Sequence, residues 1–240
     1  MNKIDEALNG LLQKYDVKPD KTLNLLPGYR FIGRELHRGD VPLLTWRSNR
    51  KFIELHNIVS NNTVENVSML RFSCFGSSDK WSPEALMYKE FDLCEFLGGA
   101  AIKSMHAVIS DNLAANIVVK LGNGVIGSVE IGIQLPSGRS PLDRHEIIAR
   151  RGVASDLAVD TQVPQSSVYT YTGHGMETYK DVDNELFGFD ELDIEHIRSA
   201  FGVIKDPQLA REFITRHHHL AMLVDAAIES DSKRKKIEVN

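Results

Sequence analysis

The chain has 240 residues, of which 42% are hydrophobic and 25% are charged, and this ordinary globular composition excludes a disordered or collagen-like chain. With 28 Lys and Arg against 33 Asp and Glu, the net charge of −5 gives no basic footprint for nucleic acid. No run approaches the ~20 apolar residues of a membrane span, and the first residues carry no signal-peptide core. Two cysteines cannot form a disulfide framework, so we expect a cytoplasmic protein.

The hydrophobic pattern predicts helices first and then strands interleaved with a few helices. Apolar residues recur at helical spacing over 4–15, 29–37, 49–60, 83–97, 194–204 and 207–228. Strand-like runs cover 41–46, 67–75, 102–109, 115–121, 125–134, 145–150 and 236–239. Residues 17–29 are rich in turn formers, and the polar residues 155–180 favour short strands. This order predicts an α+β fold, in which a large, mostly antiparallel open sheet has helices packed on one face.

End signals mark several of these helices. Ser82-Pro83-Glu84 is a good helix start, and Gly98-Gly99 is a good helix end. Asp193 is predicted to cap the next helix, and Asp206-Pro207 to start the last one. The last helix carries a single apolar stripe, formed by Leu209, Phe213, His217, Leu220, Val224 and Ile228.

The segment Gly122-Asn123-Gly124-Val125-Ile126-Gly127 matches the dinucleotide-binding pattern G-x-G-x-x-G letter for letter. That site needs a helix after the glycines, with its N-terminus facing the pyrophosphate. Here the apolar residues alternate on both sides of the motif, which indicates strands and not a helix. We therefore interpret Asn123-Gly124 as a hairpin, with a type I′ turn that requires positive φ.

The run His217-His218-His219 suggests a metal site, but its spacing does not support one. Consecutive helical residues point about 100° apart, so three in a row do not converge on one ion. Helical metal ligands are spaced i, i+4, and no such partner is present. We expect no bound metal and a half-buried core role for His217.

Five segments follow one another in a characteristic order. The first is a strand ending in Arg, which leads through a helix to a second strand. The next two are an I-D-L-x-x-x-L-x-G helix and a V-x-A strand. The last two are a glycine-containing hairpin and a closing A-I-x-S segment with a final strand. The segments are Leu44–Arg71, Phe91–Gly99, Ser104–Ala107, Ile117–Gly132 and Ala226–Val239. Together they resemble the C-terminal domain of the Gfo/Idh/MocA oxidoreductases, the glucose–fructose oxidoreductase and inositol dehydrogenase family, over about residues 41–240.

The resemblance implies an open-sheet domain that, in the family, follows an N-terminal Rossmann domain binding NAD or NADP. Residues 1–40 are too few for a Rossmann domain, so we expect them to be a helical extension, which could be a relic of such a domain's end. Lys18-Pro19 could likewise be a relic of the family's E-K-P catalytic motif, although Val17 replaces the Glu. We therefore expect this chain to bind no cofactor itself.

The resemblance also places the family's acid–base pair, an Asp and a His one turn apart on the helix that ends at L-x-G. Aligned on Asp92, the His position holds Lys89 and the Asp position holds Ala85. Lysine is almost wholly protonated at neutral pH and is a poor base. Lys89 and Lys18 are thus the candidate catalytic residues, and Arg47, Lys89 and Asp92 are the candidates for a substrate pocket.

These departures predict a truncated pseudoenzyme, which acts as a sugar-binding or oligomerisation module in a dimer or larger homo-oligomer or with a Rossmann-containing homologue. An alternative is the substrate half of a split NAD(P)-dependent oxidoreductase, completed by a separate Rossmann chain. A third is a remnant without activity, which the intact hydrophobic patterning disfavours. No membrane or nucleic-acid partner is expected.

Overall fold

The computed structural model describes residues 2–150, 152–156, 168–172, 175–179 and 183–239. These residues group into two compact units. Unit 1 takes its described residues from Met1–Gly28, Leu36–Asn49 and Ala158–Ile214. Unit 2 takes its described residues from Tyr29–Glu35, Arg50–Leu157 and Thr215–Asn240. The domain boundary expected at residues 40 and 41 stays a prediction.

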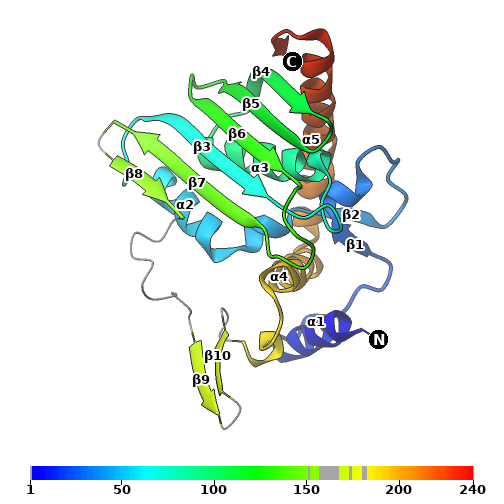
Figure 1. The fold of residues 1–240 in the computed structure, drawn as a ribbon. Helices are drawn as coiled ribbons and strands as arrows, with labels where there is room; N and C mark the ends of the chain where they lie inside the picture. The colour runs from blue at the N-terminus through cyan, green and yellow to red at the C-terminus, as the bar shows by residue number, and fades with distance from the viewer. Residues whose placement is uncertain (1, 151, 157–167, 173–174, 180–182, 240) are drawn as a thin grey trace. The chain divides into compact units, whose positions relative to one another are not determined.

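Unit 2 is built on a 7-stranded sheet in the order β11-β4-β5-β6-β3-β7-β8 (Figure 1). Its strands are β3 (Val67–Phe75), β4 (Ile102–Ser110), β5 (Ala114–Leu121), β6 (Ile126–Gly132), β7 (Leu142–Ala149), β8 (Gly152–Ser155) and β11 (Ile237–Glu238). Neighbouring strands are antiparallel, except for the central pair β3 and β6, which is parallel. The predicted α+β class and mostly antiparallel sheet are confirmed.

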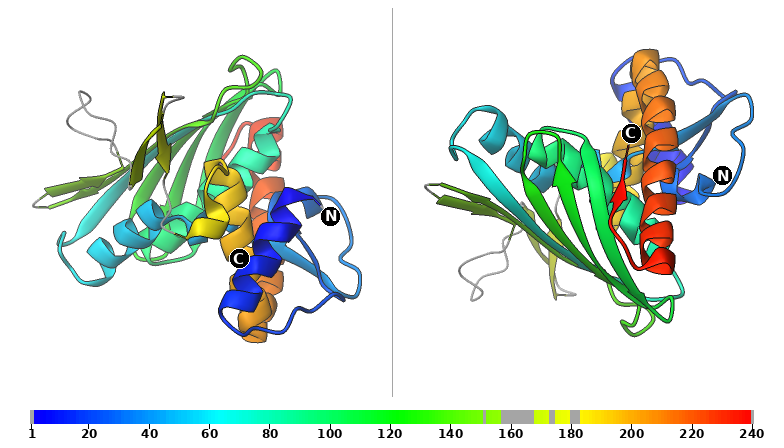
Figure 2. Two further views of the ribbon diagram at one scale, coloured as in Figure 1. Left: turned by 90° about the horizontal axis from the view of Figure 1, so that it is seen from below. Right: turned by 90° about the horizontal axis from the view of Figure 1, so that it is seen from above.

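Two helices, α2 (Arg50–Ser60) and α3 (Pro83–Gly98), cover one face of this sheet, and the opposite face carries no described helix of the unit (Figure 2). The strands alternate accordingly. On β5, Ile117 and Val119 are buried, whereas Val118 and Lys120 are exposed. The period-2 pattern read from the sequence is therefore the pattern of a sheet with one covered face.

The last helix, α5 (Pro207–Lys233), begins in unit 1 and continues from Thr215 in unit 2. Near its end, Ser230 Oγ accepts the Ala107 N–H at 3.0 Å, and Asp231 Oδ1 accepts the Ile109 N–H at 2.8 Å. These side chains satisfy backbone donors of β4 beyond the short strand β11. The predicted apolar stripe of α5 is wrong at Ile228, which is 43% exposed.

Unit 1 contains the helices α1 (Lys3–Lys14) and α4 (Glu191–Lys205), which pack through a small apolar core. This core consists of Ala7, Leu11, Leu186, Ile194 and Ile197. Two strands, β1 (Asn24–Pro27) and β2 (Asp40–Leu43), form a parallel pair. A second pair, β9 (Val168–Thr172) and β10 (Gly175–Tyr179), is antiparallel, and the rest of the strand region expected over 155–180 lies partly outside the described residues.

Three local predictions are corrected by the structure. Residues 24–27 form β1 instead of a turn, because β2 supplies a pairing partner. The helix predicted over 29–37 shrinks to a 3-10 turn, Gly28–Phe31, followed by Gly33 at φ 71°. Asp190, and not Asp193, caps α4, because the Asp190 side chain accepts the Asp193 N–H at 2.9 Å.

The glycine motif is a hairpin between β5 and β6, as predicted, but the turn is of a different type. The Leu121 N–H bonds to Val125 O at 2.9 Å and the Gly124 N–H to Leu121 O at 3.0 Å, which closes a three-residue loop. Only Gly124 has positive φ, at 90°, so the loop is a type I turn with a glycine bulge and not type I′. Asn123 Nδ2 also donates to Gly98 O at 2.8 Å, anchoring the hairpin to the end of α3.

Gly127, the last glycine of that motif, is explained by packing. A Cβ at this position would lie 2.6 Å from Val119 Cγ2 and 3.4 Å from Cys94 Sγ of α3. The absence of a side chain therefore leaves room for Val119 of the neighbouring strand β5. In this chain the glycines of the G-x-G-x-x-G pattern serve a turn and the packing of one strand against the next.

Candidate functional site

The candidate site lies on α3, whose ends the sequence sets. Ser82 caps the helix by accepting the Ala85 N–H at 3.2 Å, Pro83 occupies its first turn, and Gly99 ends it with φ 73°. The helix rests on β3 and β6, so nearly all of its side chains are buried. Among them are four charged residues: Lys89, Glu90, Asp92 and Glu95. Buried charges need partners, and two separate clusters supply them.

The first cluster is a closed circuit of opposite charges, which we call the charge ring. Its six members are Lys51 of α2, Lys89 and Glu90 of α3, Asp143 and His145 of β7, and Asp156 after β8. Lys89 Nζ lies 2.7 Å from Asp143 Oδ2 and 3.5 Å from Glu90 Oε1. The ring is therefore centred on the lysine that the family alignment put in the acid–base position.

The other half of the ring runs through His145, whose two nitrogens face two carboxylates. Its Nε2 lies 3.0 Å from Glu90 Oε2, and its Nδ1 lies 2.6 Å from Asp156 Oδ2. Lys51 Nζ closes the ring, at 3.8 Å from Asp156 Oδ2 and 3.3 Å from Asp143 Oδ2. The ring thus ties α2, α3, β7 and the end of β8 together on the covered face of the sheet.

The ring fixes the ionisation of its members. Burial by itself lowers the pKa of Lys89, but Asp143, Cys74 and Glu90 together outweigh it and raise that pKa well above its ordinary value. Burial likewise works against a charged His145, yet Glu90 and Asp156 raise its pKa above the ordinary 6.5. The pKa of Asp143 is lowered, because the cations Lys89 and Lys51 outweigh its desolvation. Three cations therefore face three carboxylates when His145 is protonated.

The second cluster joins α3 to α5. Arg216 Nε donates to Asp92 Oδ1 at 2.8 Å, and its second guanidinium nitrogen lies 2.5 Å from Glu95 Oε2. His219 Nε2 lies 2.9 Å from Glu95 Oε1, which also accepts the Ile102 N–H. Asp92 is fully buried in this arrangement. It faces Arg216 and α5, whereas Lys89 faces β7, so the two pocket candidates on α3 have different partners.

The three histidines of α5 have three different surroundings. His217 is 2% exposed, its Nδ1 lies 2.9 Å from the Tyr88 hydroxyl, and burial lowers its pKa to about 4. His218 is exposed, and His219 pairs with Glu95. The core role predicted for His217 agrees with this placement.

The remaining candidates, Lys18 and Arg47, lie in unit 1. Lys18 is exposed in the segment before β1, and Arg47 is half-buried on the 3-10 helix Thr45–Ser48. Lys89, in contrast, lies in unit 2. Their catalytic or substrate-binding roles stay predictions.

One group of potential metal ligands lies inside the ring. The ligand atoms of Cys74, Glu90 and Asp143 lie within 4.8 Å of one another. However, Lys89 Nζ already lies 3.7 Å from Cys74 Sγ and within ion-pair distance of both carboxylates. Burial also raises the pKa of the Cys74 thiol, which disfavours the thiolate that a metal requires. The ammonium group thus supplies the positive charge at this position.

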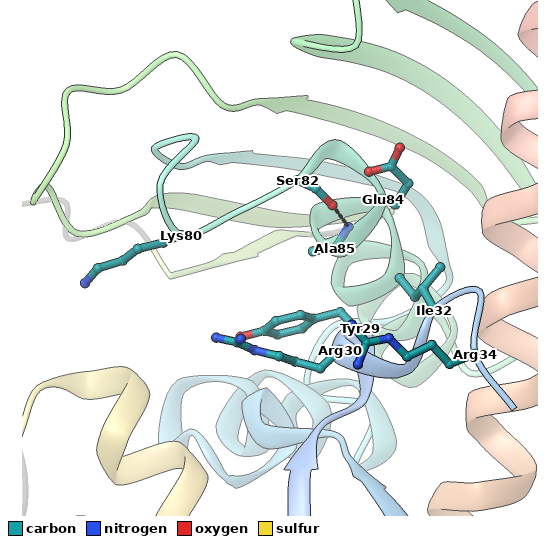
Figure 3. A pocket seen from close by; sticks show the side chains of 8 residues that line it. All are labelled: Tyr29, Arg30, Ile32, Arg34, Lys80, Ser82, Glu84 and Ala85. Carbon is teal, nitrogen blue, oxygen red and sulfur yellow. Dashed lines mark hydrogen bonds between the residues drawn. The ribbon is translucent and has the colours of Figure 1, made fainter. Parts of the chain in front are cut away.

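Unit 2 has a hollow of about 410 Å³ at the start of α3 (Figure 3). Its walls include Tyr29, Arg30, Arg34, Lys80, Ser82 and Ala85. The volume is within the usual range for small-molecule sites. Ala85, where the family alignment expects an Asp, lines this hollow, whereas Lys89 one turn further along does not.

The sequence reasoning missed both the ring and the hollow. Asp143 and His145 lie on the same face of β7 as the buried Ile147, and polar residues at such inward-facing positions were the available signal. For the hollow, Arg30 and Arg34 have the i, i+4 spacing of one helical face. Nothing in the sequence brought that segment to Lys80 and Ser82.

Fold and site together define an α+β open-sheet domain with a small hollow at the head of its central helix. Neither a protein-family model nor a curated protein sequence matches the chain. Several solved dehydrogenases share its fold. The structure of a probable dehydrogenase from Thermotoga maritima matches with a TM-score of 0.57 and 14% identity, over 83% of this chain and 64% of that chain.

Two inositol dehydrogenases give similar values. The scyllo-inositol dehydrogenase of Lactobacillus casei, solved with NAD(H) and scyllo-inositol, matches with a TM-score of 0.58 and 12% identity, over 83% of this chain and 64% of that one. The myo-inositol 2-dehydrogenase of Lactobacillus plantarum matches with a TM-score of 0.60 and 11% identity, over 84% of this chain and 65% of that one. The chain therefore spans slightly less than two thirds of these proteins, and the likeness is one of fold. No described helix is long and apolar enough to span a membrane.

Proposed function

We propose that the chain is a binding domain of dehydrogenase-type fold, which takes a sugar-like or cyclic polyol molecule in the hollow at the start of α3. In this proposal the chain transfers no hydride by itself. The polyol class comes from the inositol dehydrogenases with which it shares its fold. The placement comes from the hollow, which has the volume of a small-molecule site.

The observation that carries the proposal is the state of Lys89. A general base must be largely unprotonated near neutral pH and must reach the substrate's hydroxyl. Lys89 is 6% exposed, is held between two carboxylates and has a pKa well above its ordinary value. Ala85 contributes no titratable group at all. The two positions of the family's acid–base pair therefore lack a usable base.

The cofactor proposal follows from the hairpin. A dinucleotide site needs a glycine turn that opens a helix, but the G-x-G-x-x-G of this chain joins β5 to β6. The residues of this motif do not fit a nicotinamide dinucleotide. We propose that the chain, taken alone, binds neither NAD nor NADP.

We further propose that the chain self-associates through the open face of the sheet. This face exposes apolar side chains on several strands: Phe75, Val108, Val118, Ile126, Leu142 and Val153. Exposed apolar patches mark association surfaces, and closed symmetric dimers are the commonest outcome. Light scattering after size exclusion should give at least twice 26.9 kDa, and a clean species of 26.9 kDa would contradict self-association.

A second candidate function is the substrate half of a split oxidoreductase, and the parallel pair β1 and β2 favours it. Parallel strands occur mainly in larger sheets with both faces covered, and a two-stranded sheet is marginal alone. The pair therefore resembles the end of a larger parallel sheet, such as that of a Rossmann domain. Co-purification with a Rossmann-type chain and nicotinamide binding by the complex alone would favour this candidate.

Calorimetric titration of the purified chain tests the main proposal. We expect saturable binding of myo-inositol, scyllo-inositol or glucose and no binding of NAD(H) or NADP(H). Micromolar affinity for either nucleotide would refute the cofactor proposal. Absence of binding by every sugar and polyol, neutral or charged, would refute the binding function.

A further inference from the structure

The walls of the hollow carry an excess of positive charge. Arg30 and Arg34 come from the segment after β1, and Lys80 comes from the loop before α3. None of the three has an ion pair with a described residue. The chain as a whole is negative, at −5, so this is a local concentration of cations against the overall charge. Unpaired cations around a concave surface favour an anion.

The cations come from opposite sides of the hollow. In Figure 3 the Arg30 and Tyr29 side chains run in the same direction, and the Arg34 side chain lies on the same side of the hollow. Lys80 and the helix start at Ser82 and Ala85 lie across the hollow from the arginines, and the Lys80 ammonium is directed away from Arg34. Guanidinium groups bind phosphate and carboxylate oxygens through two parallel N–H donors. Tyr29 and Ser82 also line the hollow, and a hydroxylated body would contact them there.

Among the lining residues, Glu84 carries a carboxylate, which repels a bound anion. In Figure 3 its carboxylate is directed away from Arg30 and Lys80. Three cations against one carboxylate leave the lining positive. The start of α3 adds little, because the Ala85 N–H is already bonded to Ser82. The side-chain cations therefore decide the sign of the ligand.

We infer that the hollow at the start of α3 takes an anionic sugar or polyol, in which a phosphate or carboxylate group is held by Arg30 and Arg34, while Lys80 adds to the positive charge of the lining. This inference rests on the proposed binding function and narrows its ligand class. Neutral polyols use only the hydroxyl and aromatic part of the site. An attached oxyanion adds charge-assisted hydrogen bonds, which are the stronger kind.

The test is calorimetric titration of the whole chain with glucose, glucose 6-phosphate, glucuronate and inorganic phosphate at low salt. We expect glucose 6-phosphate or glucuronate to bind at least about tenfold more tightly than glucose. Whichever of these two binds more tightly identifies the oxyanion. The gain should be lost in Arg30→Gln and Arg34→Gln. It should persist in Arg150→Gln, a matched loss of an exposed arginine that lies after β7.

The outcomes distinguish a failure of this inference from a failure of the proposed binding function. Equal binding of glucose and both anions overturns the inference and leaves the binding function in place. An anionic preference that survives in Arg30→Gln and Arg34→Gln also overturns it. Tight binding of inorganic phosphate without any sugar supports the cationic site but refutes the sugar-binding function. No binding by any of the four probes overturns both.

Discussion

The charge ring and the hollow both include residues of α3, but they differ in whether their charged side chains have partners. In the ring, Lys89 is buried and every charge has an opposite partner within ion-pair distance. In the hollow, one turn before Lys89, the cations are exposed and have no ion pair with a described residue. A closed set of charges stabilises a structure, whereas an open set is free to meet a ligand. We therefore propose that α3 is structural at its middle and binds a ligand at its start.

The largest expected effect comes from breaking the ring at its centre. Lys89→Met keeps much of the side-chain length but leaves the buried carboxylates of Asp143 and Glu90 without their shared cation. We expect the free energy of unfolding, measured in urea, to fall by about 3 kcal/mol or more. Lys21→Met, in an exposed turn before β1, is the control and should stay within about 0.5 kcal/mol of the wild type. Equal stability of both variants would show that the ring does not hold the fold.

A smaller loss is expected in the second cluster. Asp92→Ala removes one of the two carboxylates that face Arg216, while Glu95 remains. We expect a loss of about 2 kcal/mol in urea unfolding, because a partly buried guanidinium loses one partner. Affinity for polyols should be unchanged, since Asp92 faces α5 and not the hollow. A loss of affinity in a folded Asp92→Ala would restore Asp92 as a pocket residue.

The ring should also make stability depend on pH. The pKa of His145 is raised in the folded chain, so protonation favours folding. This stabilisation is complete below the unfolded pKa of about 6.5 and is lost as pH rises through the folded pKa. The free energy of unfolding should therefore fall as the pH rises above about 6.5. His145→Gln should flatten that slope, and a wild-type profile that is flat or rising would contradict a protonated His145.

Substitutions in the hollow should change the free energy of unfolding least. Arg30→Gln and Arg34→Gln remove exposed, unpaired charges, so we expect changes within about 0.5 kcal/mol. Thermal unfolding of each variant beside Lys89→Met measures the contrast directly. A large loss in either arginine variant would mean that these cations serve the fold, and the difference between the two regions would disappear.

Much of the fold was predictable because local signals and tertiary packing agreed. In the sequence, Ser82 and Pro83 mark the start of α3 and Gly99 marks its end, and the structure has the helix between them. The alternation around Asn123-Gly124 identified a hairpin despite the fingerprint letters. The predictions failed where a distant partner decided the outcome: β1 forms because β2 pairs with it. Asp190 caps α4 because its side chain accepts a backbone N–H of the first turn. The sequence alone did not show whether Asp190 or Asp193 is placed to do this.

The site was less predictable, because its members are separated along the chain. The family resemblance directed attention to α3, and it gave Lys89 and Ala85 as departures from the family's acid–base pair. It did not indicate that Lys89 pairs with Asp143, which is 54 residues away. The hollow likewise joins residues from before and after β3. Pairing between distant charges follows from packing, which single-sequence patterns do not specify.

An NMR titration of the ¹⁵N-labelled chain with myo-inositol tests the division of α3 most directly. Binding at the hollow predicts that the amide shifts of Tyr29, Arg34, Ser82 and Ala85 change together and saturate. The amides of Lys89, Asp143 and His145 should change little, because the ring is closed to ligands. Saturating changes centred on Lys89 and Asp143 would contradict the structural role of the ring and locate the binding site there instead.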